Sequence, residues 1–199
     1  MKYFSSLPTV NITDKLGNVK SFKNIMARLA IIPEILTDPL VYYTYDIQEG
    51  DTPEIVADKY YGDSYRYWIV MFSNQYLDPQ WDWPLNNSVL NQYLLDKYTE
   101  SHLYDVHHYE KNILKIDNST NTKTKETIVI DENTYDNLTE TTTTYTLPSG
   151  STVTVSISKN IVDNYHYEFD LNESKRTINL LNSNYVNQIE REFFKLMGN

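Results

Sequence analysis

The hydrophobic pattern of this 199-residue chain changes its period once, and that change limits the possible folds more than any other feature. Over residues 52–98 apolar side chains recur at helical spacing, as Tyr65, Trp68 and Phe72 do. Over residues 101–165 they alternate with polar side chains, which is the pattern of strands. A chain that separates helices from strands in this way is typical of α+β proteins. We therefore predict an α+β fold.

The helical segment carries clear start and stop signals. Thr52 is an N-cap followed by a proline at the first helical position, and Gly62 is the left-handed residue that ends this helix. A second helix, apolar on nearly all sides, begins after Asp63, and an added third helix begins near Asn87. A run rich in Tyr, Val and Ile over Leu40–Ile47 predicts a strand before them.

The alternating segment contains a threonine-rich hairpin. Thr139–Leu147 and Ser151–Ser158 flank the sequence Pro-Ser-Gly, which predicts two antiparallel strands joined by a three-residue loop. The second strand has an apolar face, whereas the first is polar on both faces and weakly specifies its register. The exposed edge of this hairpin is a natural place for a strand of another chain to pair. After this region the chain closes with a strand over residues 176–181 and a helix that begins near Ser183.

These patterns divide the chain into four segments: an N-terminal arm (1–44), a helical segment (45–100), a Thr-rich β region (101–165) and a C-terminal strand and helix (166–199). The arm has a turn at Gly17 and a predicted helix over Ile25–Ile32. The formal charge of the chain is -10, but residues 1–40 sum to +2 and residues 41–100 to -7. The arm and the helical segment therefore have opposite signs.

Composition argues against catalysis and against several kinds of partner. The chain has no cysteine, which excludes disulfides, thiol catalysis and thiolate zinc sites. Its 4 histidines lack a metal-ligand spacing, and its 5 glycines form no nucleophile elbow and no phosphate-binding loop. Net negative charge disfavours nucleic acid, and no apolar run reaches the roughly 18–20 residues of a membrane span. We predict a protein that is not an enzyme and binds no cofactor.

One group of carboxylates could still suggest a glycosidase, namely Asp46, Glu49, Asp51 and Glu54. Acidic residues at a cap and in a first helical turn are explained more simply by the helix dipole, which is worth roughly 0.3–1 kcal/mol for each. We therefore assign these residues to the helix start.

The segment from Tyr45 to Asn74 resembles a LysM module. It has the order strand, Gly50-Asp51-Thr52 turn, helix, Tyr-Gly turn, and second helix with Trp68. The resemblance implies that Gly50, Asp51 and Thr52 line a groove for N-acetylglucosamine polymers. The closing strand of such a module is missing at its usual place, where residues 81–85 and a helix stand instead. We therefore expect a groove that lacks one wall.

The longer pattern is similar to the LysM-like baseplate wedge subunit of T-even-type contractile-tailed phages. The matching features are the basic arm, the LysM-like segment, the turn that ends at Trp83-Pro84, the helix that ends at Tyr98 and the Lys175-Arg176 strand. The resemblance implies a structural virion protein, assembled in the host cytoplasm. Its implied partners are the wedge core, a sheath-initiator-like subunit and neighbouring wedges, with no nucleic acid, no membrane and no expected glycan. The alternative function is a carbohydrate-binding module that recognises peptidoglycan.

A clamp between subunits needs oppositely charged patches and aromatic anchors. We predict Trp81 as an anchor and Trp68 as a core residue, and for Trp83 both interpretations stand equally. The full set of predicted interface residues is Trp81, Asp82, Trp83, Pro84, Lys20, Lys23 and Arg28.

Overall fold

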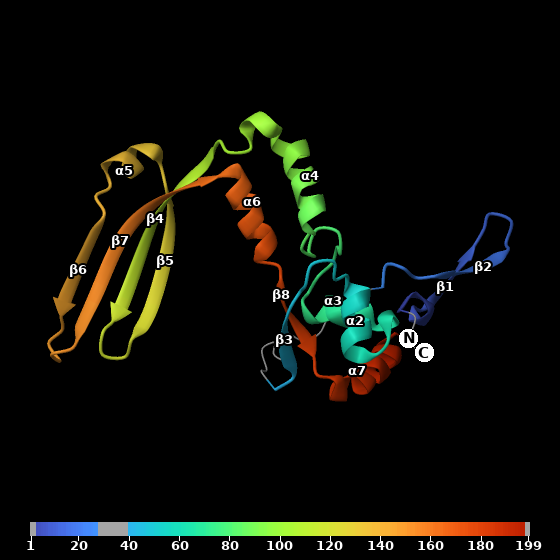
Figure 1. Ribbon diagram of the computed structural model, residues 1–199. Coiled ribbons are helices and arrows are strands. Elements are labelled where there is room, and N and C mark those ends of the chain that lie inside the picture. Colours follow the sequence, from blue (N-terminus) through green and yellow to red (C-terminus); the bar gives the residue numbers. More distant parts are fainter. Residues whose placement is uncertain (1–2, 28–39, 198–199) are drawn as a thin grey trace. The chain divides into compact units, whose positions relative to one another are not determined.

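The computed structural model of the protein describes residues 3–27 and 40–197 (Figure 1). Two compact units are present: unit 1 combines Met1–Asn87 with Asn172–Asn199, and unit 2 is Ser88–Leu171. Both units contain helices and a small antiparallel sheet, so the prediction of an α+β fold is confirmed.

The centre of unit 1 is a two-stranded sheet whose strands come from distant parts of the chain. Strand β3 (Tyr42–Asp46) pairs antiparallel with β8 (Thr177–Leu181). Helices α2 (Pro53–Tyr61) and α3 (Tyr67–Ser73) follow β3, and α7 (Ser183–Leu196) follows β8. Figure 1 shows β8 running beside β3. In sequence, all of unit 2 lies between α3 and β8, so the strand that closes this sheet is found only after the insertion.

Local signals set the limits of α2 as predicted. The Thr52 hydroxyl accepts a hydrogen bond from the Ile55 N–H at 3.3 Å, and Pro53 starts the helix. Gly62 ends it with φ of 68° and donates its N–H to Asp58 O at 2.9 Å. Asp63 caps a short 3-10 turn (Ser64–Arg66) that leads into α3.

The core of unit 1 forms around α3. Trp68, Ile69, Val70 and Met71 are all buried, so the prediction of a helix covered on several sides is confirmed. The Trp68 ring lies 4.7 Å from the ring of Phe193 on α7, centroid to centroid. The helical spacing grouped Tyr65 with Trp68 and Phe72, but Tyr65 lies in the 3-10 turn and is 51% exposed. Leu196, the last residue of α7, is 68% exposed.

The N-terminal arm contains a hairpin that its sequence pattern does not predict. Strands β1 (Thr9–Thr13) and β2 (Val19–Lys23) pair antiparallel around the predicted turn at Gly17, whose φ is 84°. The helix predicted over Ile25–Ile32 lies mostly outside the described residues, and residues 25–26 form a turn.

Unit 2 contains a four-stranded antiparallel sheet with strand order β5-β4-β7-β6. Its strands are β4 (Val106–Asp117), β5 (Thr122–Ile130), β6 (Thr141–Thr146) and β7 (Thr152–Asp163). The β6–β7 pair is the predicted Thr-rich hairpin, and β4 is a central strand that pairs with both β5 and β7.

Three helices accompany this sheet, namely α4 (Asn87–Tyr98), α5 (Glu132–Asn137) and α6 (Asn164–Glu173). Within unit 2, buried Glu168 on α6 accepts hydrogen bonds from Lys97 Nζ at 2.5 Å and Tyr98 Oη at 2.9 Å. The hydrogen bond to Glu168 is the main reason that the pKa of Lys97 is raised. Among the described residues, no helix combines the length and the apolar character that a membrane span requires.

Candidate functional site

The Gly50-Asp51-Thr52 turn is held by contacts from within its own unit. Gly50 has φ of 84°, a value that favours glycine. Only 8% of Asp51 is exposed, and its carboxylate accepts hydrogen bonds from Tyr45 Oη at 2.6 Å, Lys59 Nζ at 2.6 Å and the Gln48 N–H at 3.1 Å. The turn therefore has a paired, buried carboxylate at its centre.

The contacts of Asp51 shift two pKa values in opposite directions. Burial alone would raise the pKa of Asp51, but the hydrogen bonds from Lys59, Tyr45 and Gln48 outweigh burial and lower it below its usual value. Burial, together with the bond to Asp51, raises the pKa of Tyr45 to about 12. At neutral pH the pair is thus a phenol that donates to a carboxylate.

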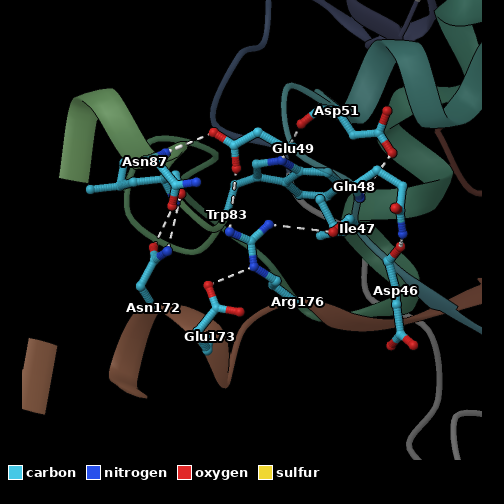
Figure 2. A network of polar contacts seen from close by, with 11 residues as sticks. Asp46, Ile47, Gln48, Glu49, Asp51, Trp83, Asn87, Asn172, Glu173 and Arg176 are labelled. Atoms are coloured by element: carbon cyan, nitrogen blue, oxygen red, sulfur yellow. Dashed lines mark hydrogen bonds and ion pairs between the residues drawn. The ribbon is translucent and has the colours of Figure 1, made fainter. Parts of the chain in front are cut away.

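The space beside the turn is filled by Trp83 (Figure 2). The indole is 6% exposed, and its Nε1–H donates to the backbone oxygen of Asp51 at 2.8 Å. The Tyr76 ring meets it edge-on, with centroids 6.3 Å apart. Trp83 therefore packs in the core of unit 1, and the neighbouring Pro84 is buried as well.

Arg176 joins the turn to the start of β8. Its guanidinium bonds Glu173 Oε1 at 2.6 Å, the Ile47 carbonyl oxygen at 3.4 Å and Glu49 Oε2 at 3.5 Å. The other oxygen of Glu49 accepts the Asn87 N–H at 2.8 Å. Figure 2 shows these side chains around the indole ring of Trp83.

Asn172 adds a second link in the same place. Its side chain accepts the Leu85 N–H at 2.7 Å and donates to the Leu85 carbonyl oxygen at 3.0 Å. Lys175 Nζ donates to the backbone oxygen of Trp81 at 2.6 Å. The loop that carries Trp81 is thus anchored at Trp81 and at Leu85 to residues that precede β8.

These contacts also account for the carboxylates that were considered as a glycosidase pair. Asp46 accepts the Thr177 hydroxyl at 2.8 Å, while Glu49 and Asp51 hold the partners described above. Glu54 lies in the first turn of α2, as its assignment to the helix start predicts. In the described part of the chain no strand follows α3 directly, and the strand that pairs with β3 is β8, so the expectation of a groove that lacks one wall stays a prediction.

The structure places the predicted interface residues in three different environments. Trp81 is 58% exposed, whereas Asp82 folds back onto its own loop and accepts the Leu77 and Asp78 N–H groups at 2.8 and 2.9 Å. These two bonds lower the pKa of Asp82. Trp83 and Pro84, the next two residues of the loop, are both buried.

The basic candidates lie on or near the β1–β2 hairpin. Lys20 is exposed, but Lys23 Nζ donates to the backbone oxygens of Ser5 and Leu7 at 2.9 and 2.7 Å. Arg28 lies outside the described residues. The structure therefore brings Trp81–Pro84 and the Gly-Asp-Thr turn together and leaves the lysines on a separate hairpin. Their role in an interface stays a prediction.

Two features of this site were missed in the sequence. Asn172 and Glu173 were not singled out, since single amide and acidic residues carry no spacing signal. Arg176 was noted only as part of the Lys175-Arg176 strand, and that dipeptide was the available signal for its role. In residues 3–27 and 40–197, no group of three or more His, Asp or Glu side chains is placed to hold a metal ion.

Comparison with known proteins identifies the family of the chain. No curated protein matches the chain significantly. A model of the family described as base plate wedge protein 53 matches residues 3–196, which is nearly the whole chain. The chain therefore belongs to the phage base plate wedge protein 53 family.

Proposed function

We propose that this structural base plate protein acts as a non-enzymatic clamp, which joins neighbouring wedge subunits during base plate assembly. The observation that carries the proposal is the exposure of Trp81 on an anchored loop. Trp81 is 58% exposed, although Asp82, Trp83 and Lys175 hold the backbone around it. A large aromatic side chain on a preorganised loop loses little entropy when it is buried by a partner.

The β1–β2 hairpin offers a second, different surface. Val10 lies opposite Phe22 and Ile12 opposite Lys20, so these four side chains share one face of the hairpin. All of them are exposed, with exposed fractions of 43% for Val10, 55% for Ile12 and 50% for Phe22. A two-stranded hairpin is marginal alone in water, and a partner that covers this face would stabilise it. Two unlike surfaces suit a subunit that links two neighbours in a closed ring.

The partners in this proposal are those that the resemblance implies: the wedge core, a sheath-initiator-like subunit and the neighbouring wedge. Their surfaces toward this chain should combine an aromatic-binding pocket for Trp81 with acidic groups near Lys20. Assembly in the host cytoplasm, followed by residence in the virion tail, belongs to the same proposal.

The carbohydrate-binding alternative gains no support from the turn. Trp83 occupies the space beside Gly50–Thr52 and already uses the backbone oxygen of Asp51 as its acceptor. A sugar would have to displace the buried indole of Trp83. Emptying a buried aromatic site costs roughly 3–5 kcal/mol in folding free energy. We therefore keep the clamp as the single proposed function.

The test is the affinity of the chain for purified wedge components, measured by titration calorimetry with wild type and Trp81→Ala. We expect Kd to rise at least about 30-fold, equivalent to about 2 kcal/mol, while the melting temperature of the free chain stays the same. Tyr65→Ala is the matched control, because Tyr65 is an exposed aromatic of the same unit with an exposed fraction of 51%. An unchanged affinity of Trp81→Ala would remove this anchor.

A further inference from the structure

The outer strand β6 of the unit 2 sheet is an unprotected edge. It is the last strand in the order β5-β4-β7-β6, and all of Thr141–Thr146 is exposed. Five of its six residues are threonine and one is tyrosine, so it has high strand propensity and no charge. Exposed edges of this kind present free main-chain donors and acceptors to any extended segment.

The opposite edge of the same sheet is protected. Strand β5 carries Lys123, Lys125 and Glu126 along its exposed length. Charged side chains, and lysine above all, are the common means by which proteins block pairing at a sheet edge. The difference between the two edges shows that the sheet is protected on one side and left open on the other.

The sheet has little cover of its own. Of the residues in β4, β5, β6 and β7, all of which the structure describes, only Val162 is buried. Side-chain hydroxyls already bridge β6 to β7, with Thr142 to Ser156 and Thr144 to Thr154 both at 3.1 Å. A fifth strand would extend both the main-chain ladder and this row of hydroxyls.

Charge indicates which kind of strand fits. Residues 126–158 contain no lysine or arginine, while the segment that leads into β6 holds Asp131, Glu132, Asp136 and Glu140. Lys159 is the nearby base, and its Nζ is already bound to the Tyr135 carbonyl oxygen at 2.8 Å. If β6 paired with β6 of a second copy, the second strand and its flanking residues would bring no lysine or arginine to the acidic residues that precede β6. The fitting strand is therefore not a second copy of β6.

We propose that β6 receives an extended strand of another base plate protein, one that carries a lysine or arginine beside the acidic end of β6 and uncharged polar side chains along the rest. This inference rests on the proposed base plate role and adds a surface to it. The bond-forming groups are the outward main-chain N–H and C=O groups of residues 141–146. Unit 2 would thus be a docking arm of the subunit.

Hydrogen exchange of the free chain and of purified base plates tests the proposal. We expect amides of residues 141–146 to exchange at least about tenfold more slowly in the base plate, and amides of β5 to change little. If unit 1 amides are protected in the base plate but β6 amides are not, this inference fails and the clamp proposal stands. If the chain is absent from base plates, both fail. Concentration-dependent protection of β6 in the free chain would mean self-pairing and overturn the choice of partner.

Two variants sharpen the test because the register aligns their sites. One row across the sheet, from β5 to β6, consists of Thr124, Lys115, Val155 and Thr143. Thr124 and Thr143 therefore occupy the same face of the sheet at its two opposite edges. Thr143→Lys places a blocking charge on the open edge, and we expect its incorporation into base plates to fall about tenfold in competition with wild type. Thr124→Lys is the matched control and should be incorporated as wild type. Equal incorporation of the two variants would overturn the proposal, provided that exchange in β7 of the free variants is unchanged.

Discussion

Asn74 and Asn179 exchange two hydrogen bonds across 105 residues of sequence. The side-chain oxygen of Asn74 accepts the Asn179 N–H at 2.7 Å, and its amide nitrogen donates to the Asn179 carbonyl oxygen at 2.9 Å. The same nitrogen donates to Val70 O at 2.8 Å. The side-chain amide of Asn74, at the end of α3, thus binds the N–H and C=O groups of one β8 residue, as a residue of a neighbouring strand would. It joins the two parts of unit 1 that the insertion of unit 2 separates in sequence.

Replacing this amide should destabilise unit 1. We expect Asn74→Ala to lower the free energy of unfolding by about 1–2 kcal/mol, because it removes the side chain that binds both backbone groups of Asn179. Urea denaturation followed by tryptophan fluorescence measures this change, since Trp68, Trp81 and Trp83 all belong to unit 1. Asn91→Ala, at an exposed helical position of α4, is the control and should leave stability within about 0.5 kcal/mol. A loss for Asn74→Ala no larger than that of the control would contradict the role of the amide.

Trp83→Phe tests the link between the indole and the turn. The ring remains but the donor to Asp51 O is lost, and we expect a loss of about 1–3 kcal/mol in unfolding free energy. Trp83→Ala empties the site as well and should cost about 3–5 kcal/mol. Neither the wild type nor Trp83→Phe should bind chitin oligomers in a calorimetric titration. Saturable binding by the wild type would overturn our account of a filled groove.

The lowered pKa of Asp51 predicts acid sensitivity. Its folded-state pKa lies below its unfolded value of about 3.8, so the unfolded chain binds the proton more readily. The stability that Asp51 contributes is therefore present above about pH 4 and is lost as pH falls through the folded-state pKa. Unfolding free energy measured from pH 6 down to pH 2 should fall more steeply for wild type than for Asp51→Asn.

Asp58→Asn provides the control for this pH profile, because Asp58 is exposed on the same helix. Its profile should follow that of the wild type. Parallel profiles of wild type and Asp51→Asn would show that the carboxylate network around Asp51 contributes nothing to acid stability.

Unit 1 should fold without unit 2. Leu85 and Asn172 are joined by two hydrogen bonds, so the ends left by removing residues 88–171 lie close together. We expect a chain in which a short Gly/Ser linker replaces these residues to unfold cooperatively and to keep the buried fluorescence of Trp68 and Trp83. The same shortened chain with Asn172→Ala should be less stable by about 1–3 kcal/mol, because the Leu85 groups lose their partner. A shortened chain with no cooperative transition would show that unit 1 depends on the insertion.

Several elements could be predicted from the sequence because their causes are local. The Thr52 cap, Pro53 and Gly62 act within one turn of α2, and the Pro-Ser-Gly loop joins strands that are neighbours in the chain. The α+β class followed from a periodicity that also spans only a few residues at a time. Strand β4 and helix α6 were not predicted as elements, and α6 has no clear apolar stripe in its sequence.

The candidate site depended on contacts that no local pattern contains. From the sequence, Trp83 suited a core and an interface equally well. In the structure Trp83 is buried beside Asp51 and belongs to the core, whereas Trp81 is exposed and remains the candidate anchor. Only tertiary structure showed that β8 closes the sheet of β3 and that Arg176, Asn172 and Asn74 join the two parts of unit 1. Caps, turns and periodicity depend on interactions between residues that are neighbours in the sequence. Pairing across an insertion is instead decided by which distant surfaces bury the most apolar area and satisfy the most polar groups together, and that balance belongs to the folded chain as a whole.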